Sequence, residues 1–173
     1  MNIKRFSIFL SSALALGALS TVASDALATD PVDLEVTADI VANCTIQATP
    51  IQFGNYDPIV VNLASPLDST GAVTVTCTKG ASAKIKLGQG ENVGAGSTDA
   101  APVRRMTDET NFLSYSLSSV APGGTEWGNT DITGVSHTGD GSETELTVHG
   151  RVAAGQNVPI GSYADTVVAT VTF

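Results

Sequence analysis

Basic side chains are scarce in this sequence. Only 8 lysine and arginine residues stand against 17 aspartate and glutamate residues, which gives a formal net charge of −9 at pH 7. A surface of this charge repels phosphate backbones and no basic cluster offsets it, so the composition disfavours nucleic-acid binding. Charged residues nonetheless make up only 14% of the chain, which suits an exported β protein better than a disordered acidic segment.

Catalytic motifs are also missing. The chain has no Gly-x-Ser-x-Gly, His-Glu-x-x-His or Cys-x-x-Cys sequence, and those spacings belong to nucleophile elbows, zinc proteases and dithiol redox sites. His137 lies in a loop rich in serine, threonine and glycine, and His149 lies on the polar face of an expected strand, so both are interpreted as surface residues. We therefore expect no enzyme activity, no cofactor and no metal site.

Long apolar runs are confined to the amino terminus. Lys4 and Arg5 precede an apolar run from Phe6 to Leu19, and small residues follow, in the order typical of a secretory signal peptide. We expect residues 1–28 to be removed, although cleavage after Ser24 also fits the pattern. The run is shorter than the roughly 20 residues of a spanning helix, and no later run is longer, so we expect no membrane span after cleavage.

Cysteine is rare, with Cys44 and Cys77 as its two occurrences. An exported chain reaches an oxidising compartment, so we expect one intramolecular disulfide, with free or intermolecular thiols as the alternative. Closing a loop of this length contributes about 3–4 kcal/mol in the chain-entropy model. Zinc would require four nitrogen or sulfur donors at close spacing, which disfavours metal binding by these thiols.

Alternation of apolar and polar residues is the main pattern that the chain does contain, and it predicts strands. The candidate strands are separated by segments rich in glycine, proline and asparagine, as in all-β folds. They cover the ranges 42–48, 72–78, 83–87, 111–118, 144–153 and 163–173. Together with a strand nearer the amino terminus, they indicate an immunoglobulin-like β-sandwich, with an eight-stranded barrel as the alternative.

The segment directly after the expected cleavage site alternates most strictly. Its apolar positions are Val32, Leu34, Val36, Ala38 and Ile40. Only three residues separate Ile40 from Cys44, so a strand continuous with the next one would far exceed the usual 5 or 6 residues. We therefore interpret residues 29–41 as a separate arm.

Three other residues are interpreted individually. Arg104 and Arg105 form a lone basic pair, which we assign to the charged edge of a strand. Trp127 is the single tryptophan, and we expect it to be a core or rim aromatic rather than a platform for a glycan.

Six stretches of the chain follow one another in a distinctive order. They are ANCTIQATPIQFGNYDP (42–58), VTVTCTKG (73–80), RRM (104–106), LSYSL (113–117), EWGN (126–129) and VHGRVAAGQNVPIGSYADTVVATVTF (148–173). In this order they resemble the spore coat protein U domain, a family that includes subunits of archaic chaperone-usher pili. The resemblance covers nearly the whole chain after the expected signal peptide.

The resemblance implies an immunoglobulin-like pilin domain over residues 42–173 that lacks its final strand, with a disulfide joining its first two strands. It also implies that residues 29–41 are a donor-strand extension, whose apolar positions enter the groove of a neighbouring subunit. One wall of that acceptor groove would be formed by the apolar face of the last segment: Val167, Ala169, Val171 and Phe173.

The expected function is that of a structural subunit of a surface pilus, which polymerises by donor-strand exchange and supports adhesion or biofilm formation. Its implied partners are identical or related pilin subunits, a periplasmic chaperone and an outer-membrane usher, and its implied location is the cell surface. The alternative is a secreted monomeric or coat-associated β-sandwich binding protein that is completed by its own amino-terminal strand.

Overall fold

The computed structural model describes residues 30–173. The expected signal peptide lies outside these residues. The chain divides into one unit that ends at Ala38 and a second unit, Asp39–Phe173, which contains all the strands found among the described residues. Residues 30–43 have no regular secondary structure.

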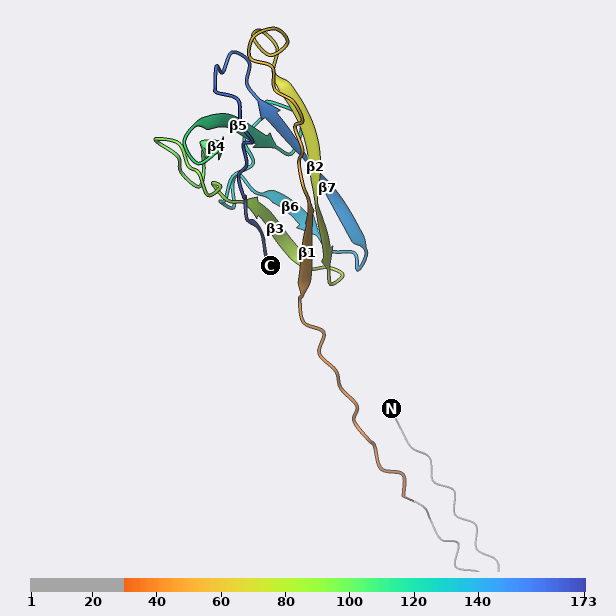
Figure 1. The fold of residues 1–173 in the computed structure, drawn as a ribbon. Coiled ribbons are helices and arrows are strands. Elements are labelled where there is room, and N and C mark those ends of the chain that lie inside the picture. Colours follow the sequence, from red (N-terminus) through yellow and green to blue (C-terminus); the bar gives the residue numbers. More distant parts are fainter. Residues whose placement is uncertain (1–29) are drawn as a thin grey trace, which may run out of the picture. The chain divides into compact units, whose positions relative to one another are not determined.

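Eight strands form the described part of the domain (Figure 1). They are β1 (Cys44–Thr49), β2 (Leu67–Cys77), β3 (Ser82–Leu87), β4 (Arg104–Thr107), β5 (Phe112–Ser118), β6 (Val135–Thr138), β7 (Glu143–Val152) and β8 (Ala169–Thr172). No helix occurs among residues 30–173, so the prediction of an all-β fold is confirmed.

The strands form two antiparallel sheets. One has five strands in the order β1-β2-β7-β5-β4, and the other has three in the order β6-β3-β8. Figure 1 shows β3 and β6 side by side, with the carboxyl terminus close to β3, which is the pairing partner of β8.

The core draws side chains from both sheets. Val73 and Val75 of β2, Ile85 of β3 and Leu117 of β5 are almost completely buried in one cluster. Alternation explains this placement, because every second residue of a strand faces the same side. Trp127 joins the cluster and its indole N–H donates to the Ile85 carbonyl at 2.9 Å, so its interpretation as a core aromatic is confirmed.

Two of the observed strands, β4 and β6, were not among the strands predicted from the sequence. The strands β4 and β6 span only four residues each, too few for alternation to stand out.

The assignment of Arg104 to a strand edge is wrong, because its side chain is 0% exposed. Its charge is tolerated in the core because an acidic side chain and several carbonyl oxygens surround it.

The last strand is also shorter than predicted. We expected it to begin at Tyr163, but the regular ladder with β3 covers only Ala169–Thr172. The partner strand β3 ends at Leu87, and the turn that follows, with a positive φ of 85° at Gly90, interrupts the regular ladder. Residues 163–168 are held by other contacts.

Candidate functional site

Each sheet has two edge strands that are paired on a single side: β1 and β4 in the five-stranded sheet, and β6 and β8 in the three-stranded sheet. The register of β1 with β2 runs from Cys44 opposite Cys77 to Thr49 opposite Ala72. The strand β8 pairs with β3 alone. Such edges present unpaired N–H and C=O groups, which can pair with a further strand.

Two adjoining cavities lie between the segment that follows β1 and the segment that leads into β8. Their volumes are about 710 Å³ and about 420 Å³, and we call them together the groove. The residues that line both cavities are Ile51, Phe53, Met106 and Tyr163. The groove is therefore continuous along the two segments.

The floor of the groove consists of core side chains. Leu87, Leu117 and Val148 line the smaller cavity, and Leu113 and Val152 line the larger one. All five are at least 95% buried, yet they face a space far larger than the voids of a closed core. The floor of the groove is thus apolar, while the rim of the larger cavity also includes polar side chains such as Gln52, Asn55 and Ser162.

The first wall of the groove comprises residues 48–58. Phe53 packs edge-on against Tyr115 of β5, with ring centroids 6.2 Å apart and an interplanar angle of 62°. It crosses β7 at Gly150, where a Cβ atom would lie 2.7 Å from the Phe53 ring. The absence of a side chain at Gly150 therefore allows the wall to lie directly on the sheet.

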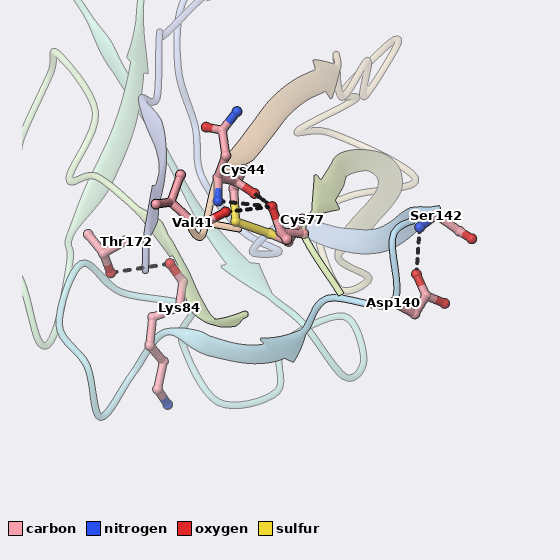
Figure 2. Close-up of a disulfide and its surroundings, with 9 residues drawn as sticks. Val41, Cys44, Cys77, Lys84, Asp140, Ser142 and Thr172 are labelled. Carbon is pink, nitrogen blue, oxygen red and sulfur yellow. Dashed lines mark hydrogen bonds between the residues drawn. A yellow bond between two sulfur atoms is a disulfide. The ribbon is translucent and has the colours of Figure 1, made fainter. Parts of the chain in front are cut away.

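A disulfide anchors the strand that leads into the first wall (Figure 2). Cys44 and Cys77 are directly opposite each other in the ladder between β1 and β2, and they are joined covalently as predicted. Just before β1, the backbone N–H of Thr78 donates to the Asn43 carbonyl at 2.9 Å, and the Asn43 N–H donates to the Thr78 hydroxyl at 3.1 Å. The start of β1 is therefore fixed on both sides of the disulfide.

The second wall comprises residues 163–173, whose side chains alternate between half-buried and exposed up to Thr172. Of the residues expected to face the groove, Val167 and Ala169 line the smaller cavity, and Val171 packs against the core without lining either cavity. Phe173 is 56% exposed. The structure thus brings Val167 and Ala169 to the groove.

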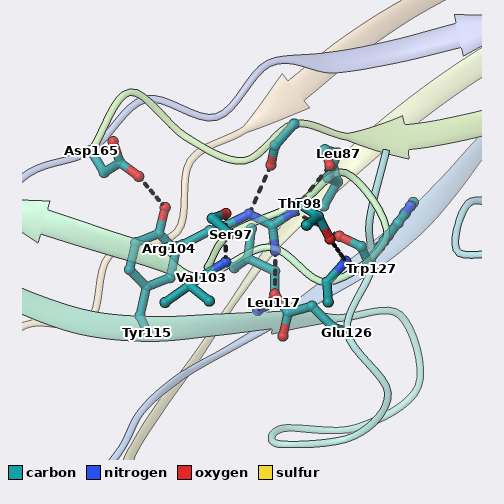
Figure 3. A network of polar contacts seen from close by, with 12 residues as sticks. Leu87, Ser97, Thr98, Val103, Arg104, Tyr115, Leu117, Glu126, Trp127 and Asp165 are labelled. Atoms are coloured by element: carbon teal, nitrogen blue, oxygen red, sulfur yellow. Dashed lines mark hydrogen bonds and ion pairs between the residues drawn. The ribbon is translucent and has the colours of Figure 1, made fainter. Parts of the chain in front are cut away.

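A buried ionic cluster lies beneath the second wall (Figure 3). Arg104 forms an ion pair with Glu126. Its guanidinium also donates to the carbonyls of Gly88 at 2.8 Å, Leu87 at 3.0 Å and Trp127 at 2.7 Å. The arginine therefore connects β4 with the end of β3 and with the segment around Trp127.

Burial dominates the electrostatics of this cluster. It raises the pKa of Glu126, and the hydrogen bond from the Leu117 N–H and the charge of Arg104 partly offset that rise. Burial also lowers the pKa of Arg104, although the guanidinium remains charged because its reference value is so high. The pair is a structural element, since neither group lines the groove.

The arm consists of residues 30–41 in the described chain. Its large apolar side chains, Val32, Leu34, Val36 and Ile40, are each 83–89% exposed. The intervening residues are mostly acidic: Asp33, Glu35 and Asp39 with Thr37. The arm therefore presents an uncovered apolar row opposite a polar one, and its role as a donor strand stays a prediction.

Other kinds of site find little support in the described residues. Between residues 30 and 173 no three histidine, cysteine, aspartate or glutamate side chains are grouped as a metal would need. The described part of the chain also contains no helix that is long and apolar enough to span a membrane. What the groove can do chemically is bind an extended apolar segment.

The sequence did not point to several residues of the groove. Ile51 and Phe53 belong to a segment without regular structure, where alternation gives no signal. Tyr115 and Asp165 line the smaller cavity and are joined by a hydrogen bond of 2.7 Å, although 50 positions separate them. The only available signal was that all four lie within stretches that carry the family resemblance.

Three comparisons relate the chain to known proteins. The family model described as "Spore Coat Protein U domain" matches residues 31–170. The chain is 44% identical over 154 residues to Protein U of Myxococcus xanthus, covering 84% of this chain and 86% of that protein.

Among solved structures, the chain is similar to a chain of the CsuC–CsuE complex, a chaperone–tip adhesion subunit pre-assembly complex from the archaic chaperone-usher Csu pili of Acinetobacter baumannii. The TM-score is 0.53 at 19% identity, and the match covers 78% of this chain and 40% of that chain. At this identity the likeness concerns the fold alone.

Proposed function

The chain belongs to the spore coat protein U domain family, and from this premise we propose that it is a structural subunit of a surface pilus that polymerises by donor-strand exchange. The observation that carries the proposal is the pairing of an open groove with an uncovered arm on the same chain. The groove has an apolar floor between the segment that follows β1 and the segment that leads into β8, and the arm offers exposed apolar side chains at alternate positions.

The arm has the periodicity that such a groove requires. Alternate residues of a strand lie about 6.6 Å apart on one face, so successive apolar side chains of the arm would enter successive positions along the floor. Burying four large apolar side chains contributes roughly 6–12 kcal/mol before the ordering cost of the arm. Backbone hydrogen bonds to a free edge would add to this.

The polar face of the arm also suits a donor strand. Asp33, Glu35 and Asp39 would point to solvent once the apolar row is buried. Charges on an added strand discourage further strands from pairing there. The arm and the groove are different surfaces, so two subunits joined by one contact still have one free arm and one free groove. The assembly therefore grows as an open filament.

The partners follow from the same chemistry. Before assembly the groove needs a temporary strand, which we assign to a periplasmic chaperone, and an outer-membrane usher would exchange it for the arm of the next subunit. The filament would extend from the cell surface and support adhesion or biofilm formation. No catalytic role is proposed.

A second candidate rests on the family's description as a spore coat domain. In this function the chain is a coat-associated or secreted monomer, and its arm fills its own groove. The two candidates share the groove and differ in whether the arm comes from the same copy or from another.

Deleting residues 29–40 separates the two candidates. In the pilus subunit the deletion abolishes high-mass, detergent-resistant polymers, while the domain still binds its chaperone. Size-exclusion chromatography and unheated gel electrophoresis of periplasmic extracts measure both properties. A wild-type protein that is a stable monomer, and that unfolds when the arm is deleted, would favour self-completion and contradict the pilus proposal.

The substitution Ala38→Arg tests the face of the arm. It forces a long charged side chain toward the apolar floor, so it blocks assembly when the variant is the donor and leaves its own groove functional. The matched control is Thr37→Arg, which adds the same charge to the polar face and should leave assembly intact. Equal behaviour of the two variants would contradict the proposed orientation of the arm.

A further inference from the structure

Asp165 lies in the second wall with both carboxylate oxygens engaged. One oxygen accepts from the backbone N–H groups of Glu91 at 3.0 Å and Asn92 at 3.2 Å, and from the Asn92 side-chain amide at 3.1 Å. The other accepts from the hydroxyl of Tyr115 at 2.7 Å, a contact that Figure 3 shows. One side chain thus ties the wall to a turn and to β5.

The turn at residues 88–92, which contains Glu91 and Asn92, is shaped to receive the Asp165 carboxylate. Gly90 has a φ of +85°, and a Cβ atom there would lie 2.2 Å from the carboxylate oxygen that Tyr115 contacts. Successive backbone N–H groups that converge on one oxygen form a favourable site for a negative charge. The chain fills this site with its own Asp165.

Tyr115 is a dependable donor in this arrangement. Burial first, and then the hydrogen bond with Asp165, raise the pKa of the phenol well above its ordinary value, so the hydroxyl keeps its proton. Tyr115 also lies opposite Arg104 in the ladder between β5 and β4, and Arg104 holds the Gly88 carbonyl at 2.8 Å. The turn that receives Asp165 is therefore anchored at its first residue.

The wall has few other attachments between its ends. Ala164 exchanges two backbone hydrogen bonds with Thr107, at 2.8 and 3.0 Å, and the Val168 carbonyl accepts from Gly88 at 2.9 Å. Between them the Thr166 carbonyl accepts from the Glu91 N–H at 3.1 Å. Asp165 supplies the side-chain hydrogen bonds of this stretch, and it lies on the same face as Val167, two residues further on.

We propose that Asp165 is a positioning residue for the groove: with Tyr115 and the Gly88–Asn92 turn it holds the second wall in its binding conformation before a donor strand arrives. The inference rests on the proposed function of the groove, and it identifies the side chain that orders the second wall before binding. Asp165 and Tyr115 line the smaller cavity together with Val167. A wall that is already ordered spares the incoming strand the cost of ordering it.

The test measures binding of a fluorescent peptide with the sequence of residues 30–41 to the full-length mature chain carrying Ala38→Arg, which keeps its groove empty. Adding Asp165→Ala should weaken binding about tenfold, mainly through slower association, because the competent conformation becomes a minor one. Tyr115→Phe should act in the same direction, and the double variant should bind no worse than Asp165→Ala alone.

Asp140→Ala is the matched control. Asp140 likewise accepts a backbone N–H in a turn, from Ser142 at 2.7 Å, but it does not line the groove. Added to the Ala38→Arg chain, Asp140→Ala should leave the association rate of the peptide unchanged. Equal rates for Asp165→Ala and Asp140→Ala would overturn the inference.

Amide hydrogen exchange on the same samples keeps the test independent of peptide binding. Loss of Asp165 should speed exchange in residues 163–168 and 91–92 and leave β2 unchanged, and unchanged exchange there would overturn the positioning role. If the Ala38→Arg chain binds no peptide while the exchange result holds, the proposed function fails and the inferred contact survives. If Asp165→Ala does not fold, Tyr115→Phe decides both measurements, since it removes one hydroxyl only.

Discussion

The two walls of the groove are held in different ways. The first wall follows β1, which pairs with β2 over six residues and is joined to it by the Cys44–Cys77 disulfide. The second wall pairs with β3 over only four residues, and upstream of them it depends on Asp165 and a few backbone contacts. The strand that leads into the first wall is therefore cross-linked covalently, and the second wall is held by reversible hydrogen bonds.

This difference teaches which wall can respond to a bound strand. A disulfide restricts the unfolded chain and keeps β1 in register whether the groove is empty or full. Hydrogen bonds to a turn can open and close locally at much lower cost. On our account, the second wall adjusts when one strand replaces another, and the first wall serves as a fixed support.

The largest effect is expected from Arg104→Ala, which undermines the second wall. The change leaves Glu126 partly buried without its partner and removes the donor from the carbonyls of Leu87 and Trp127. We expect a loss of about 3–5 kcal/mol in the free energy of unfolding, measured by urea denaturation. Hydrogen exchange should rise in residues 88–92 before it rises in β1.

Arg105→Ala is the control for that variant, since Arg105 stacks on the Phe112 ring with its guanidinium carbon 3.9 Å from the ring centroid, and is not in the core. It should cost less than about 1 kcal/mol. A similarly small loss for Arg104→Ala would contradict the view that the buried pair supports the second wall.

Removal of the disulfide should affect the other wall. The double variant Cys44→Ser, Cys77→Ser is expected to lose about 2–4 kcal/mol of unfolding free energy. Faster exchange should appear in β1 and leave residues 163–168 unchanged in the folded protein. Treatment with a reductant should destabilise the wild type and not the variant, and loosening of both walls together would refute the assignment of separate anchors.

Gly90→Ala tests the turn that receives Asp165. The substitution combines an unfavourable positive φ with a Cβ atom 2.2 Å from the carboxylate, and we expect a loss of about 1–3 kcal/mol. Gly96→Ala is matched in backbone conformation, with φ +79° and nothing within 4 Å of the added atom. The difference between the two variants in thermal or urea unfolding isolates the contact with Asp165, and no difference would contradict it.

The smallest effect is expected for an ion pair that belongs to neither wall. Asp68 on β2 accepts two hydrogen bonds from Arg151 on β7, at 2.6 and 2.7 Å, and this contact lowers the pKa of Asp68. A lowered pKa means that the pair stabilises the fold above the carboxylate's unfolded value and loses this contribution as the pH falls through the folded value.

Both side chains of this pair are about one-third exposed, so Asp68→Asn should cost less than about 1 kcal/mol at neutral pH. Urea unfolding of wild type and variant at pH 7 and below pH 3 measures the difference. The two proteins should converge in acid. A gap that stays constant with pH would show that the ionised carboxylate is not the source of the stabilisation.

Sequence reasoning succeeded where a local pattern carries the information. Alternation at Val73, Val75 and Cys77 located the second half of β2, although the strand begins at Leu67, before the predicted range. The scarcity of cysteine in an exported chain pointed to one bridge. It failed for Arg104, whose burial depends on Glu126 and on carbonyls 16 to 23 positions away. Asp165 was part of a recognised motif, but its partners at Glu91, Asn92 and Tyr115 are known only from the fold.

The most direct test of the proposed assembly is amide hydrogen exchange in residues 32–40 of the assembled protein, compared with the unassembled chain. The arm's apolar side chains are exposed in the single chain, so their amides should exchange rapidly before assembly. If the arm fills a neighbour's groove, these amides should become strongly protected in the polymer. Polymers in which residues 32–40 exchange as fast as in the monomer would contradict donor-strand exchange.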